Sequence, residues 1–270
     1  LTLVGFGVGF FSAGVGVGGG ALLMPLLVSV FRFDFKRAAA ISLATILPIT
    51  CVGALSYAFW LPESPDLRYY LAFIPACVAG TMAGTGLVSK QQNRWMKFAF
   101  SLYLLTASVR MLRLMDFPAL IFLSLDHFEW LNTWPVVFGA GFLAGMIAVN
   151  LGVGCGLLIV PCFVIMIDWP IHQAIVLSLT TMFFLSLSAT LVQKKLRRLD
   201  MDSVKQLFVP ALIGATLGVI VSSRLPATVL QKIFGLFLFA VTCGYLIEDL
   251  LTIDLRTTSS RAVFIAGLNA

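Results

Sequence analysis

The stretch GVGVGGG at residues 14–20, followed by Pro25, interrupts the first apolar segment of the chain, which runs from about residue 2 to residue 30. Each glycine disfavours a helix by about 1 kcal/mol relative to alanine, so this stretch is predicted to unwind. A segment of this length is also too long for one untilted membrane span. We therefore expect residues 2–30 to fold as two short elements on either side of a glycine break.

A second break of the same kind lies 136 residues further along, where NLGVGCG at 150–156 is followed by Pro161. The same shift aligns other residues without a gap: Gly5 with Gly141, Phe6 with Phe142, Gly9 with Gly145, Ala38 with Ala174, Ser42 with Ser178, Leu43 with Leu179 and Thr45 with Thr181. With a slip of one or two residues, Pro75 aligns with Pro210 and Gly80 with Gly214. Matching Gly, Pro, Ser and Thr in register indicates an internal duplication, which is common in secondary transporters.

The composition makes lipid the solvent of most of the surface. Of 270 residues, 60% are hydrophobic and only 11% are charged, and the mean hydropathy is +1.01. A soluble domain carries about 25% charged residues. The fold class is therefore an all-α integral membrane protein with about 8–10 transmembrane elements and glycine-broken helices. The candidate apolar segments are 2–30, 38–60, 69–88, 96–115, 134–167, 173–193, 203–223 and 229–251.

The organisation follows from the duplication and from the basic residues. We expect repeat 1 over 1–115, a linker or interfacial segment over 116–133, repeat 2 over 134–251 and a C-terminal segment over 252–270. The net charge is +6, and the basic residues lie in short loops between apolar segments, as the positive-inside rule predicts, so nucleic-acid binding is excluded. If 2–30 and 134–167 each form two elements, each repeat has five elements. Because five is an odd number, the second repeat then has the opposite orientation to the first, and the basic loops fall on one side of the membrane. We therefore favour inverted over parallel repeats.

The glycine breaks are the predicted solute site. An unwound stretch that leads into a helix directs several amide N–H groups and the positive end of the helix dipole at one point, which suits an anion. Close packing of helices through small residues is the alternative, and we favour it for Gly5, Gly9, Gly141 and Gly145. The glycines assigned to the site are Gly16, Gly18, Gly19, Gly20, Gly152, Gly154 and Gly156.

Polar side chains near the breaks are further candidates. The hydroxyls of Ser42, Thr45, Ser178 and Thr181, with Thr180 beside them, either bind an oxyanion or bond back to a carbonyl four residues earlier. Asn150 serves equally well as a site residue or as a contact between helices. Cys155 replaces Gly19 in the second break, and packing is the simpler role for it.

The residue types argue against an enzyme. Every Asp and Glu lies in a loop or at the end of a segment, and there are only two histidines, so paired catalytic carboxylates or a metal cluster are not expected. The same distribution offers no buried carboxylate for coupling to protons or sodium. We predict no cofactor and no metal, and the five cysteines, which lie inside apolar segments, indicate nothing about disulfides.

The pattern resembles the TauE/SafE family of membrane permeases. The resemblance rests on Gly5-Phe6 with Gly9, on residues 16–20 with Pro25, and on Ala38 with Ser42, Leu43 and Thr45, all repeated in the second half. It covers about residues 2–251. Members of the family are linked with the export of sulfite and the passage of organosulfonates such as sulfoacetate, so the resemblance implies a sulfur oxyanion as the solute.

These observations favour a secondary transporter that works by alternating access between two repeats. An anion channel and a non-transporting accessory membrane subunit are the alternatives. The expected partners are a small anionic solute and the lipid bilayer, in a bacterial inner membrane crossed several times. Assembly into homo-oligomers is left open.

Overall fold

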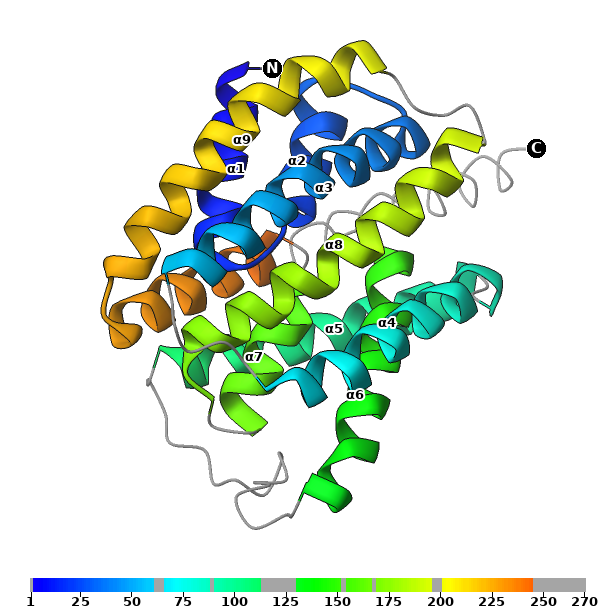
Figure 1. The fold of residues 1–270 in the computed structure, drawn as a ribbon. Helices are drawn as coiled ribbons and strands as arrows, with labels where there is room; N and C mark the ends of the chain where they lie inside the picture. Colours follow the sequence, from blue (N-terminus) through cyan, green and yellow to red (C-terminus); the bar gives the residue numbers. More distant parts are fainter. Residues whose placement is uncertain are drawn as a thin grey trace, which may run out of the picture.

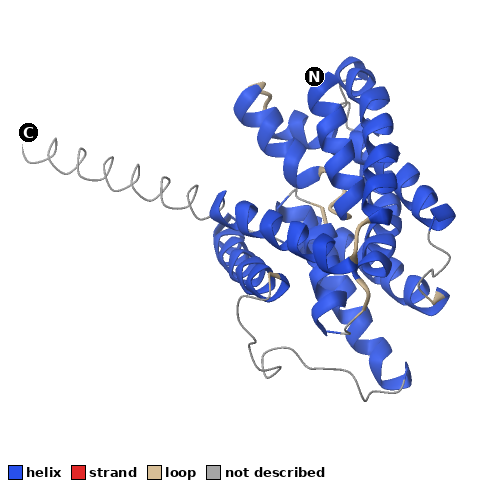
Figure 2. Ribbon diagram, turned by 90° about the vertical axis from the view of Figure 1, so that its left-hand side faces the viewer, coloured by secondary structure: helices blue, strands red, loops and turns tan. Residues whose placement is uncertain are grey.

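The computed structural model describes residues 2–60, 66–87, 90–112, 130–151, 154–166, 169–195 and 201–244. Within these ranges the chain is helical apart from short turns and loops, as Figure 2 shows. The predicted linker lies outside the described residues except for its last four positions, which already belong to a helix, and the predicted C-terminal segment lies entirely outside them. The helices are α1 (Thr2–Val15), α2 (Gly20–Pro25), the π-helix η1 (Leu26–Val30), α3 (Phe35–Trp60), α4 (Leu67–Leu87), α5 (Lys90–Met111), α6 (Trp130–Leu151), α7 (Gly156–Met166), α8 (Ile171–Lys195), α9 (Met201–Arg224) and a helix over Ala227–Gly244.

Both long apolar segments divide as predicted. Segment 2–30 gives α1, then α2 with η1, and segment 134–167 gives α6, which starts four residues earlier than expected, and α7. The other predicted segments each contain one helix, with bounds that differ by a few residues. Four helices are long and apolar enough to cross a membrane, at 40–60, 171–191, 202–224 and 227–244.

Two helix pairs, with α3 and α8 packed together between them, organise the bundle (Figure 1). Helix α1 packs along α9, and α4 packs along α6, while α3 lies against α8 and α9. Helices α1 and α9 are far apart in the sequence, yet they share one of the most extensive contacts in the bundle. The core is therefore shared between the two halves of the chain.

Glycine allows the close approach in both pairs. A Cβ atom on Gly9 would collide with the carbonyl oxygen of Ala211, and one on Gly145 would collide with that of Cys77. Gly5 lies against Leu207 and Gly141 against Phe73 in the same manner. The packing role predicted for Gly5, Gly9, Gly141 and Gly145 is confirmed, since small residues let helix backbones touch.

The outer surface is apolar, as a lipid solvent requires. Large hydrophobic side chains stand exposed on several helices, among them Leu3, Phe59, Leu71, Met82 and Leu236. In water such a surface would drive aggregation. Against hydrocarbon it is the expected exterior of a helical bundle whose backbone groups are satisfied internally.

Candidate functional site

The first glycine run breaks the helix where the sequence predicts. Helix α1 ends at Val15 and α2 begins at Gly20, and Gly16, Gly18 and Gly19 all have positive φ angles, of 79°, 76° and 86°. An L-residue with a side chain rarely adopts this conformation, so the run needs glycine at these three positions. The whole stretch is buried. An irregular backbone buried in this way must find its hydrogen-bond partners inside the protein.

Side chains from two other helices bind the free carbonyls at the end of α1. The Tyr57 hydroxyl of α3 donates to the carbonyl of Gly14 at 2.9 Å. The Ser178 hydroxyl of α8 donates to the carbonyl of Gly16 at 2.8 Å. Two carbonyls of the break, those of Gly14 and Gly16, are therefore satisfied by side chains of α3 and α8.

The amide groups of the same break have a different environment from these two carbonyls. Gly19 is the N-cap of α2 and provides no side-chain cap. Within the described part of the chain, no acceptor is found for the N–H groups of Gly18, Gly19 and Gly20. These donors lie just before a helix start, where the backbone carries partial positive charge.

A buried hydroxyl without a partner lies beside these amides. Ser12 is 0% exposed, and among the residues that the structure describes its Oγ has no hydrogen-bond partner. That Oγ would lie 3.0 Å from a Cβ atom on Gly19, so it faces the break directly. An unpaired hydroxyl in a core costs about 1–3 kcal/mol, a cost that a bound ligand would offset.

The second break repeats the backbone pattern of the first. Helix α6 ends at Leu151, Gly154 has a φ of 83°, and α7 begins at Gly156. The carbonyl of Cys155 accepts the amides of Leu158 and Ile159, just as the carbonyl of Gly19 accepts those of Leu22 and Leu23. Gly152 lies outside the described residues, as does the side chain of Asn150, which belongs to the last turn of α6.

The two breaks touch each other. A Cβ atom on Gly156 would lie 2.6 Å from the carbonyl oxygen of Gly16 and 2.8 Å from that of Val17. Only glycine permits this approach. The structure thus brings together two predicted breaks that are 136 residues apart in the chain, with the glycines Gly16, Gly18, Gly19, Gly20, Gly154 and Gly156.

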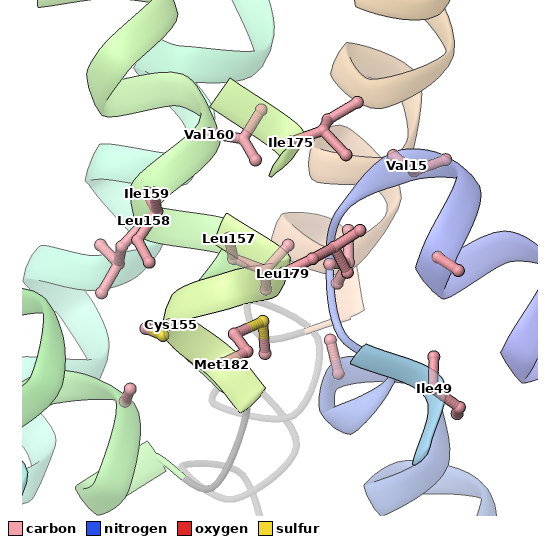
Figure 3. Close-up of a cluster of buried hydrophobic side chains, with 14 of the residues drawn as sticks. Val15, Ile49, Cys155, Leu157, Leu158, Ile159, Val160, Ile175, Leu179 and Met182 are labelled. Atoms are coloured by element: carbon pink, nitrogen blue, oxygen red, sulfur yellow. The ribbon is translucent and has the colours of Figure 1, made fainter. Parts of the chain in front are cut away.

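Met182 of α8 fills the space between the breaks. Its thioether lies against Gly18, and its methyl carbon would be 2.6 Å from a Cβ atom on Gly154. Met182 is 2% exposed. Figure 3 shows its side chain next to Cys155 of the second break, with Leu179 and Ile175 earlier in α8.

The predicted hydroxyls separate into two groups. Thr45, Thr180 and Thr181 each donate to the carbonyl four residues earlier in their own helix, at 2.8 Å in all three cases. Ser42 is 1% exposed, and its Oγ has no partner. The two serines therefore differ from the threonines: Ser178 bonds to the first break and Ser42 is unpaired.

Cys155 packs against another thiol. It is buried, and its side chain lies beside that of Cys77 in α4. Both cysteines are free thiols, as are Cys51, Cys162 and Cys243. This contact ties the second break to the α4–α6 pair.

Three residues of this region were not predicted from the sequence. Tyr57 and Ser12 could have been suspected as polar groups inside apolar segments, because such groups need a partner in lipid. Met182 gives no signal of this kind, since methionine is an ordinary core residue. His172 lies at the start of α8, where its Nε2 is 3.3 Å from the carbonyl oxygen of Ser222.

Comparisons with known proteins agree with this architecture. A family described as "Sulfite exporter TauE/SafE" matches residues 1–117 and 137–268. A curated protein described as "Probable membrane transporter protein YunE", from Bacillus subtilis (strain 168), is 30% identical over 91 residues. That alignment covers 34% of this chain and 33% of the relative, so the chain matches about a third of the relative's length. No solved structure matches.

Proposed function

Because this chain belongs to the TauE/SafE sulfite exporter family and is a multi-pass membrane transporter rather than an enzyme, we propose that it carries a small sulfur oxyanion, sulfite or an organosulfonate such as sulfoacetate. It acts as a secondary transporter, in a bacterial inner membrane, by alternating access between two halves. Apart from the family, the observation that carries the proposal is the set of three unbonded amides at residues 18–20 beside the unpaired hydroxyl of Ser12.

The helix bounds support a duplicated origin for the two halves. Helices α1 and α6 end at Val15 and Leu151, α2 and α7 begin at Gly20 and Gly156, and α3 and α8 begin at Phe35 and Ile171. Each pair is separated by the 136 residues of the sequence repeat. Secondary transporters use such paired halves to expose one central site to either side in turn.

Reciprocal contacts support a two-fold relation between the halves. Gly80 of α4 faces the carbonyl of Phe142 in α6, and Gly214 of α9 faces the carbonyl of Phe6 in α1. Each glycine and its partner carbonyl are the repeat counterparts of the other pair. We propose that the two-fold axis lies in the plane of the membrane, because inverted halves place the basic loops on one side.

The proposed site binds its anion through the first break. The amides of Gly18, Gly19 and Gly20 and the hydroxyls of Ser12 and Ser42 are donors without partners, and an oxyanion has acceptor oxygens for several of them. Gly16, Gly154 and Gly156 shape the contact between the breaks. Thr45 and Thr181 do not provide donors to the site, since their hydroxyls are already bonded to backbone carbonyls of their own helices.

Flux in proteoliposomes tests both the transport and the site. Purified protein is expected to carry radiolabelled sulfite with saturating kinetics and to support counterflow, whereas a channel would show neither counterflow nor saturation in this range. Ser12→Ala is expected to raise KM roughly 10-fold or more, because a hydrogen bond to a charged ligand contributes about 1.5–3 kcal/mol.

Thr181→Ala is the matched control, because that hydroxyl is equally buried but bonds only to its own helix. It is expected to leave KM unchanged. Equal KM values for wild type, Ser12→Ala and Thr181→Ala would remove Ser12 and the first break from the site. Absence of flux for every sulfur oxyanion tried would remove the transport proposal itself.

A further inference from the structure

One face of α8 closes over the first break. Ile175, Ser178 and Met182 follow one another at helical spacing, so they share a face. Ile175 lies within 2.9 Å of where a Cβ atom on Gly16 would be, Ser178 holds the Gly16 carbonyl, and the Met182 thioether lies against Gly18. Nothing larger than glycine fits beneath this face.

Met182 alone among these three contacts both breaks. Its methyl carbon lies against Gly18 of the first break and against Gly154 of the second. An anion that reaches the amide of Gly18 from the side of α8 would have to take the space that this thioether now occupies. Because Met182 is only 2% exposed, its thioether fills this space, and the solute site is closed on the α8 side in the described structure.

The chemistry of the side chain fits a movable plug. Methionine has three rotatable bonds and repacks easily, whereas a β-branched side chain is held in one preferred rotamer. The repeat counterpart of Met182 is Ile46, which is equally buried in α3. The two halves thus present a flexible side chain on one side and a stiff one on the other.

We propose that Met182 is the gate of the solute site: its thioether lies over Gly18 and Gly154 in the closed form and swings aside to let the anion reach the Gly18 amide. The inference rests on the proposed function, because the gate serves the site at the first break. Ser178, one turn earlier on the same face, is a positioning residue that keeps α8 registered on Gly16.

Substitutions that change volume and flexibility separately test the gate. Met182→Leu keeps the volume but has fewer rotatable bonds, and it is expected to lower the maximal sulfite flux at least 3-fold with KM unchanged. Met182→Ala removes the plug, and it is expected to give sulfite efflux that no longer saturates. Met111→Leu and Met111→Ala are controls, since Met111 is similarly buried but lies on α5 against Gly235.

A second measurement needs no substrate. In a variant that keeps only Cys155 of the five cysteines, the buried thiol is expected to react with a small methanethiosulfonate reagent at least 10-fold faster after Met182→Ala, but not after Met111→Ala. Thermal unfolding of each purified variant establishes that it is folded before labelling.

The outcomes separate the two proposals. Unchanged Cys155 labelling in folded Met182→Ala would overturn the gate, whether or not sulfite is carried. Faster labelling together with no flux of any sulfur oxyanion in the wild type would support the gate and reject the proposed solute. Sulfite flux with the same kinetics as the wild type in both Met182 variants would overturn the gate but leave the transport proposal standing.

Discussion

Gly7 and Gly9 lie two residues apart in α1 and have opposite environments. A Cβ atom on Gly9 would collide with the carbonyl of Ala211, whereas one on Gly7 would meet nothing within 4 Å. The sequence identifies Gly9 as a packing residue only through its repeat counterpart Gly145, because composition alone does not distinguish the two glycines. Register along a helix decides which glycine is needed.

Gly9→Ala is therefore expected to destabilise the protein by about 1–3 kcal/mol, the usual range for overpacking. The α1 and α9 backbones would have to separate to admit the methyl group. Thermal unfolding in detergent measures the change. Gly7→Ala, the control in the same helix, is expected to be neutral or slightly stabilising, because alanine favours helix. Equal melting temperatures for the two variants would contradict the packing role of Gly9.

Tyr57 is a second test at the scale of single residues. Its hydroxyl lies between the Gly14 carbonyl at 2.9 Å and the Ser222 hydroxyl at 2.6 Å, joining α3 to α1 and α9. Tyr57→Phe leaves the Gly14 carbonyl without its partner, and it is expected to lower the free energy of unfolding by about 1–3 kcal/mol.

The same unfolding measurement applies to Tyr103→Phe, which removes a comparable hydroxyl–carbonyl bond, to Leu158 of α7. A similar loss in both variants would assign Tyr57 a general packing role. A loss of sulfite flux in Tyr57→Phe alone would link it to the first break. A Tyr57→Phe variant as stable as the wild type would contradict the bond to Gly14.

At the scale of elements, the sequence locates the helix breaks but not what covers them. Glycine propensity predicts that α1 ends near residue 16, and the second run predicts α7 in the same way. Which side chains face the breaks depends on how α3 and α8 are rotated, and neither helix has a strongly one-sided apolar pattern to indicate that rotation. The serines and threonines of α8 therefore could not be assigned to roles in advance.

Ser178 and Thr181 test that rotation. Ser178→Ala removes the bond to the Gly16 carbonyl in another element, whereas Thr181→Ala removes a bond within α8. We expect Ser178→Ala to lower stability by about 1–3 kcal/mol and to reduce flux, and Thr181→Ala to change both by much less. Denaturation and transport assays on the two variants check this. Equal effects would show that the contact with the first break is unimportant.

At the scale of the whole molecule, the sequence predicts the duplication from matched small and polar residues, and the helix bounds follow the same offset. The exchange of partners between the halves is not visible in the sequence, because the glycines of α1 are compatible with any neighbouring helix. Contacts between distant segments arise only from the packed structure.

Inverted halves make a direct topological prediction. Asp34 and Pro170 are exposed counterparts, just before α3 and α8. In a variant without native cysteines, Asp34→Cys and Pro170→Cys are expected to react with a membrane-impermeant maleimide from opposite sides, one in intact cells and the other in everted vesicles. Labelling of both from the same side would show that the halves are parallel and leave the two-fold contacts unchanged.

The pairing of α1 with α9 has a consequence for biogenesis. The ribosome delivers α1 long before α9, the helix against which its glycines pack. Until α9 is inserted, the glycines of α1 face lipid or an insertase. In the same way, α4 lacks its packing partner until α6 is inserted. Neither half is a finished unit when it leaves the translocon, so assembly must follow insertion, and a chain truncated before α9 would be a substrate for membrane proteases.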